Sequence, residues 1–177
     1  MIDSLRKSRR QRLRAARSRG LALPIVLLIA AMMLTTSAAW FEQTVVAARN
    51  AAGILDHLTA MHAADSALTV CVRNLINGPH ADTPAASGEP VGWKSQATFE
   101  SNALAPFASW PTSLSVRAPQ CLIEAWRLGN RANAQAYLVT ARGYGRSVDS
   151  QMWVQLQVVI DGSAVEKHWR RIAARPF

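Results

Sequence analysis

The sequence predicts an α+β fold in which a long N-terminal helix, transmembrane at its start, packs on a small antiparallel β-sheet. Three observations predict this fold. A stretch without charged residues runs from Gly20 to Phe41, and an alanine-rich stretch with helical spacing continues from it to Asn77. The last third of the chain contains strand-length runs of alternating character. Because a helix with one apolar face and a half-buried sheet each need a partner, we expect them to cover each other.

Residues 1–20 form a strongly basic leader. They hold eight lysine and arginine residues against Asp3 alone, whereas the whole chain of 177 residues has a formal net charge of +9. The remainder of the chain is therefore nearly neutral. A run of arginine beside an apolar segment is more typical of a topology signal than of a nucleic-acid site. We expect a cytoplasmic leader and no nucleic-acid partner.

Residues 21–41 form the predicted transmembrane half of the helix. At about 1.5 Å per residue, the apolar stretch is roughly 33 Å long, close to the thickness of a bilayer core. Basic residues before it and Glu42 after it predict a cytoplasmic N-terminus and an exported body, in a single pass. A conventional secretory signal is the alternative, with Leu21–Leu34 as its apolar region and Ser37 and Ala39 before the cleavage point.

Residues 42–77 form the predicted amphipathic half of the same helix. Alanine, the best helix former, fills many of its positions. The sequence Asn77-Gly78-Pro79 predicts the end of the helix, because glycine ends helices readily and proline cannot continue them. The larger side chains follow steps of four and three residues, which places one acid and six apolar residues on one face: Ile54, Leu58, Met61, Asp65, Leu68, Val72 and Leu75.

Residues 78–92 are a predicted loop rich in proline, glycine and alanine, and residues 93–177 are the predicted antiparallel sheet domain. No element is predicted for 93–119, because prolines interrupt it. The clearest strand is 150–160, in which Met152, Val154, Leu156 and Val158 alternate with other residues. The predicted strands are 120–128, 135–144 and 150–160, and 165–177 is expected to add an edge strand.

Three passages carry a resemblance to a known family. The first is Arg19-Gly20-Leu21-Ala22-Leu23, at the junction of leader and apolar stretch. The second runs from Phe41-Glu42 to Ala63-Ala64-Asp65-Ser66-Ala67-Leu68, and the third is Tyr137-Leu138-Val139-Thr140-Ala141-Arg142-Gly143-Tyr144-Gly145. In their order and spacing they resemble the type IV pilin family, most closely the PilX-type minor pilins. The chain is also similar to the GspK-like pseudopilins of type II secretion.

The resemblance implies a processing site, a location and partners. A prepilin peptidase would cut this class III leader between Gly20 and Leu21, and the new amine of Leu21 would be methylated. The subunit would stay in the inner membrane with a periplasmic body and then enter the pilus fibre beside other minor and major pilins. Pro24 fits such a cut, because a proline is tolerated in the first turn of a helix and disrupts a helix interior.

Two residues are candidates for subunit interfaces. Most pilins have a glutamate at the fifth mature position, and here that position is Ile25. The missing carboxylate favours an initiating or tip-complex minor pilin, a feature that GspK-like subunits share. Asp65 is the one acid on the apolar helix face, and it either pairs inside the domain or contacts another pilin.

The two cysteines, Cys71 and Cys121, both fall in the part predicted to be exported. An even number in an oxidising compartment predicts a disulfide between the helix and the first strand, with two buried free thiols as the alternative. No histidine lies at ligand spacing from them, so we expect no metal and no cofactor. No catalytic motif is present, which predicts a non-enzymatic protein. A periplasmic binding module behind an ordinary signal peptide remains the other function class.

Overall fold

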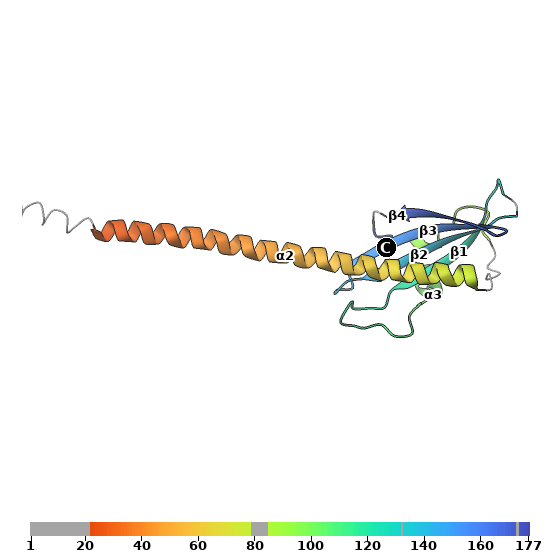
Figure 1. Cartoon of the computed structure of the whole chain (residues 1–177), viewed down its shortest axis with the longest axis horizontal. Coiled ribbons are helices and arrows are strands. Elements are labelled where there is room, and N and C mark those ends of the chain that lie inside the picture. The colour runs from red at the N-terminus through yellow and green to blue at the C-terminus, as the bar shows by residue number, and fades with distance from the viewer. Residues whose placement is uncertain (1–21, 79–84, 132, 173) are drawn as a thin grey trace, which may run out of the picture. The chain divides into compact units, whose positions relative to one another are not determined.

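The structure, a computed structural model, describes residues 22–78, 85–131, 133–172 and 174–177. It contains the helix α2 (Ala22–Asn77), a short 3₁₀ helix η1 (Gly92–Lys94) and the helix α3 (Gln96–Asn102). Four strands follow (Figure 1): β1 (Gln120–Arg127), β2 (Gln135–Tyr144), β3 (Gln151–Asp161) and β4 (Ala164–Arg171). This is the predicted α+β architecture. The leader 1–20 lies outside the described residues.

Internal contacts divide the chain into two units, Met1–Ala51 and Ala52–Phe177. In the first unit, α2 is long and apolar enough to cross a membrane, as judged by length and composition. The hydroxyls of Thr35 and Thr36 donate to the carbonyl of Met32 at 2.9 and 3.0 Å, so that these polar groups are satisfied within the helix. The large apolar side chains of this stretch are exposed: Leu23, Ile25, Val26, Leu27, Leu28, Ile29, Met32, Met33 and Leu34.

The second unit contains a four-stranded antiparallel sheet with the order β1-β2-β3-β4, in which each strand pairs with its neighbour in the sequence. The three strands expected between residues 120 and 160 are confirmed to within one residue, and the expected edge strand is present but ends at Arg171 and does not reach residue 177. Gly162 lies in the tight turn between β3 and β4 with φ of 60°, a conformation that glycine adopts without strain. The region 93–119, for which no element was predicted, holds most of η1 and all of α3. The side chain of Ser95 caps α3 by accepting from the amide of Thr98.

The end of α2 covers one face of the sheet. It ends at Asn77, as predicted, where the amide of Gly78 donates to the carbonyl of Asn74. The core on this face combines Leu68, Val72 and Leu75 of the helix with apolar residues of β2 and β3. The buried helix residues are Ala60, Ala63, Ala64, Ala67, Leu68, Cys71, Val72 and Leu75.

The predicted helix face is therefore wrong over its first half. Ile54, Leu58 and Met61 are exposed, and the alanines around them face the sheet instead. The small side chains on this face accompany a close approach of the helix backbone to β2, as described below at Gly143. The apolar face predicted from the larger side chains is correct only from Leu68 onward.

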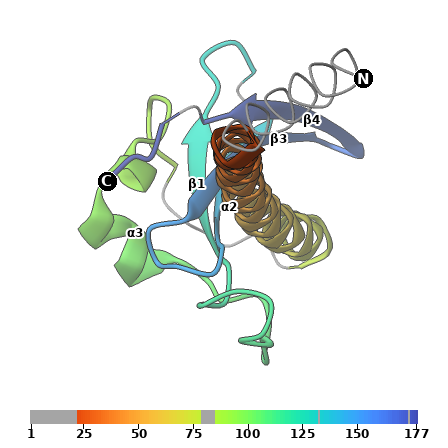
Figure 2. The same ribbon diagram turned by 90° about the vertical axis from the view of Figure 1, so that its left-hand side faces the viewer.

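A second, smaller core lies on the opposite face of the sheet. It contains Phe99 of α3, Leu122 of β1 and Trp153 of β3, with Trp93 and Phe177 packed against them. In Figure 2, α3 and the C-terminal end lie on one side of β1. The segment between the predicted loop 78–92 and β1 thus contributes Phe99 and Trp93 to this second core.

Candidate functional site

The predicted cleavage site cannot be placed, because Gly20 and Leu21 lie outside the described residues. Ile25 lies on α2 in the first unit, with 54% of its surface exposed. An apolar side chain that this unit leaves uncovered is suited to lipid or to another apolar helix. Its role as an interface residue stays a prediction.

The predicted disulfide is present between Cys71 of α2 and Cys121 of β1, which are 50 residues apart in the sequence. Both cysteines are buried in the core between helix and sheet. The bond joins the last turns of α2 to the first strand. It therefore fixes the helix to the sheet at the end where the loop leaves the helix.

Asp65 is half-buried on α2, next to the buried Ala64. Among the described residues it has no hydrogen bond and no ion pair. The alternative that Asp65 pairs inside the domain thus finds no support in this part of the chain. A carboxylate with spare acceptors at the margin of a helix–sheet contact is suited to a donor from another chain.

Helix and sheet approach each other closely at Gly143 of β2. A Cβ atom placed there would overlap the carbonyl oxygen of Ala60 and the amide nitrogen of Ala64. Both are backbone atoms of α2, so no side-chain movement relieves the overlap. Gly143 and the alanines of α2 therefore form one packing unit.

A second contact holds the β2–β3 connection to the helix. Asp56 of α2 accepts a hydrogen bond of 2.5 Å from the amide of Arg146 and another from the hydroxyl of Ser150. These bonds, the first of them above all, lower the pKa of Asp56 below its ordinary value. The carboxylate is thus stabilised in its charged form by a turn that lies about ninety residues further along the chain.

We expect Asp56→Asn to destabilise the protein near neutral pH by about 1 kcal/mol, since the hydrogen bonds lose their charged acceptor and solvent screens a half-buried site. Because the folded-state pKa is lowered, the stabilisation is present above the unfolded pKa, about 3.9. It is lost as the pH falls through the lower folded value. Urea unfolding of the two proteins between pH 7 and pH 3 should show the difference shrinking in acid.

The matched control is Asp149→Asn in the same connection. Its side chain is 97% exposed and lies 3.9 Å from Arg175, which makes a weak surface pair. We expect this variant to unfold like the wild type at every pH. An Asp56 variant with the same pH profile as the wild type would contradict the role of Asp56.

A cavity of 740 Å³ lies beside β1, and Leu75, Leu104, Ile123, Glu124 and Tyr137 are among its lining residues. Burial raises the pKa of Glu124, although its carboxylate accepts hydrogen bonds from the amides of Gly92 and Trp93. Both oxygens of this carboxylate are thus engaged in holding η1 against the sheet. The remaining lining is mostly apolar, with no nucleophile and base within reach of each other.

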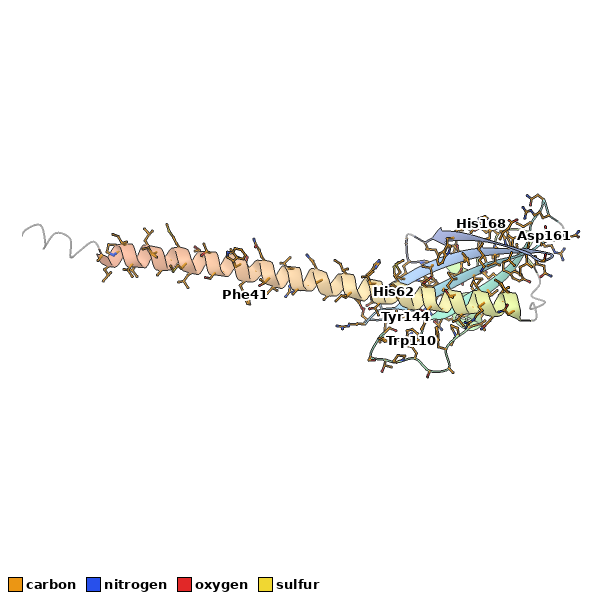
Figure 3. The ribbon with its side chains drawn as sticks, viewed as in Figure 1. Phe41, His62, Trp110, Tyr144, Asp161 and His168 are labelled. Carbon is orange, nitrogen blue, oxygen red and sulfur yellow. A yellow bond between two sulfur atoms is a disulfide. The ribbon has the colours of Figure 1, made fainter. Side chains whose placement is uncertain are left out.

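The three histidines that the structure describes do not gather into a site. His62 lies on α2 and His168 on β4, at separate places in Figure 3. His57 lies on α2, and His80 falls outside the described residues. Within the described ranges, no group of three histidine, cysteine or acidic side chains is positioned to hold a metal ion.

Arg142 is a residue that sequence analysis passed over. It lies on β2 directly before Gly143, and only 3% of its surface is exposed. Its guanidinium lies 4.8 Å from the ring centre of Phe99, 5.1 Å from that of Tyr144 and 5.3 Å from that of Trp153. The ring of Phe177 lies at 5.7 Å. Several aromatic faces around one cation stabilise it through their negative faces.

Comparisons of the chain with protein-family models, with curated proteins and with solved structures found no match. The chain's class therefore has to be argued from its own features. These are a long helix with an apolar start, a four-stranded antiparallel sheet packed on the end of that helix, and one disulfide between them.

Proposed function

We propose that this chain is a non-enzymatic minor pilin that takes part in assembling a type IV pilus, in the initiating or tip complex. It is inserted in the inner membrane with its N-terminus in the cytoplasm and its sheet domain in the periplasm. A prepilin peptidase cuts between Gly20 and Leu21 and frees the apolar helix for packing with other minor and major pilins.

The observation that carries this proposal is the continuity of α2. The apolar segment and the helix that packs on the sheet are one element of 56 residues, Ala22–Asn77. A signal peptidase that cut after Ala39 would divide this element in its interior. A cut at Gly20 keeps the whole helix, as a subunit that assembles through that helix requires.

Exposed apolar side chains beyond Glu42, the first charged residue after the apolar stretch, give independent support to the proposal. Val46, Ile54 and Leu55 follow Glu42, and each has more than half of its surface exposed. A bilayer core of about 30 Å is already filled by the residues before Glu42. Other proteins are therefore better suited than lipid to cover this part of the helix. Helices of similar subunits match its shape and polarity.

Ile25 supports a position at the filament end. Where most pilins have a carboxylate to pair with a neighbour's N-terminal amine, this chain presents an apolar side chain. GspK-like subunits of type II secretion share this feature, so a type II secretion pseudopilin is the second candidate function. Deleting the gene in the producing bacterium distinguishes them: loss of surface fibres supports the pilus, and loss of protein secretion supports the pseudopilin.

The N-terminus of the mature protein tests the proposal directly. We expect mass spectrometry of the chain purified from membranes to find methylated Leu21 as its first residue. In the matched variant Gly20→Leu, which blocks the junction that the peptidase reads, the chain should still begin at Met1. A wild-type chain that begins at Trp40 would establish a secretory signal, and one that keeps Met1 would establish an uncleaved anchor. Either result contradicts the proposal.

A further inference from the structure

A second cavity, of 390 Å³, lies on the face of the sheet opposite α2. Its lining residues are Glu100, Ala105, Arg117, Ala118, Gln120 and Arg142. They come from α3, from the segment between α3 and β1, and from the paired positions Gln120 and Arg142 of β1 and β2. The volume is at the lower end of the range of about 300–1,000 Å³ typical of small-molecule sites.

The nitrogens Nη1 and Nη2 of the Arg142 guanidinium are near two other residues that line this cavity. Nη2 donates to the side-chain oxygen of Gln120 at 2.6 Å, and Nη1 lies 3.8 Å from the carboxylate of Glu100. Gln120 and Glu100 both line the cavity. The opposite side of the guanidinium is enclosed, because Nε is buried without a hydrogen-bond partner in the described part of the chain.

Within the described part of the chain, Arg142 has one ion pair, a long one with the half-exposed Glu100. A buried cation is costly unless it is paired and hydrogen-bonded, and aromatic faces supply only part of the compensation. Glu100 lies beyond hydrogen-bond distance from Nη1, and its side chain is 48% exposed. Burial lowers the pKa of Arg142 below its ordinary value, and the positive charge of Arg117 acts in the same direction.

A further arginine adds positive charge to the same cavity. Arg117 is exposed, and its guanidinium lies 5.9 Å from the centre of the Tyr144 ring, the ring that Arg142 also contacts. The cavity wall thus has two cations and one carboxylate. Like charges held at one cavity repel each other, and an anion bound between them relieves that repulsion.

We propose that this cavity binds a carboxylate group between Arg142 and Arg117. A guanidinium presents parallel N–H donors that match the two oxygens of a carboxylate. The wall has one positive charge in excess, which a monoanion neutralises. A phosphate dianion would instead place surplus negative charge beside Glu100.

The test titrates acetate into the full chain in neutral detergent micelles at constant ionic strength, with chloride as the balancing anion. NMR signals of the arginine side-chain N–H groups report binding. We expect saturable shifts of the Arg142 and Arg117 signals. Arg117→Gln should weaken acetate binding about tenfold, because one charge-assisted hydrogen bond is lost. Arg127→Gln, an exposed arginine of β1 that does not line the cavity, should leave the affinity unchanged.

Three results would overturn the proposal: no saturable shift with acetate, equal weakening by both variants, or phosphate binding as tight as acetate binding. A second titration identifies the source of the carboxylate. If acetyl-glycyl-glycine binds at least tenfold tighter than acetate, the site is for a polypeptide carboxylate, and equal affinities indicate a small free acid. Amidated acetyl-glycyl-glycine should not bind, and binding of this amide would also contradict the proposal. None of these outcomes depends on whether the chain is a pilin.

Discussion

Gly143→Val should separate the helix from the sheet and lower the free energy of unfolding by about 3 kcal/mol or more, since overpacking against backbone atoms cannot be relieved by a change of rotamer. Any side chain at this position meets the backbone of α2 at Ala60 and Ala64. Moving the helix outward to make room would also open the core around Leu68 and Val139. Urea unfolding of the full chain in detergent micelles, followed by tryptophan fluorescence, measures the loss.

Two other glycines provide matched controls. A Cβ at Gly129 or at Gly53 would meet no atom within 4 Å. Gly129→Ala should therefore change the stability by no more than about 0.5 kcal/mol. Gly53 lies within α2, where alanine is the better helix former, so Gly53→Ala should raise helix stability by about 0.5–1 kcal/mol. A Gly143 variant as stable as the wild type would show that helix and sheet do not meet there.

Removing the disulfide should lower the free energy of unfolding by about 2–4 kcal/mol, the second-largest effect expected for this chain. The bond closes a long loop, because its cysteines are 50 positions apart in the sequence, and such a constraint reduces the conformational freedom of the unfolded chain. The variant of choice is Cys71→Ala combined with Cys121→Ala, because alanine leaves no buried polar group. Urea unfolding in the absence of reductant measures the effect.

Reductant provides the control for the disulfide. It should destabilise the wild type by a similar amount and leave the double alanine variant unchanged. Labelling of thiols in the unfolded wild type confirms that reduction is complete. If the fully reduced wild type unfolds at the same urea concentration as the oxidised protein, the disulfide does not stabilise the fold.

The features that sequence analysis predicted correctly are those determined by local pattern. The helix up to Asn77 follows from alanine content and the Gly78-Pro79 stop, and the strands follow from alternation over a few residues. The disulfide follows from a count of two cysteines. These signals are contained in short windows or in composition, so they do not depend on how distant segments meet.

The features that it missed depend on contacts between distant segments. The buried alanine face of α2 meets β2 at Gly143, where the helix backbone leaves no room for a Cβ on the strand. The sequence does contain a signal of this contact. It combines one glycine in a predicted strand with alanines at helical spacing, at positions 60, 63, 64 and 67. Asp56 finds its donor on the amide of Arg146, and a backbone donor leaves no side-chain pattern to detect.

Arg142 was missed for a different reason. Arginine in a strand is normally read as an exposed position, because its charge is rarely buried. Here rings from α3, β2, β3 and the C-terminal end enclose it, and no local window contains all of them. The candidate carboxylate site therefore became visible only with the structure.

The alanine face of α2 also has a consequence for synthesis of the chain. Ala64 is synthesised before Gly143, so this helix face stays uncovered while the residues between them are translated. At 5–20 residues per second, this takes roughly 4–16 s. A face of leucine or phenylalanine would expose a large hydrophobic area to other nascent chains during this time. Methyl groups alone offer little, so this face resists premature association and still fits closely once its own strand arrives.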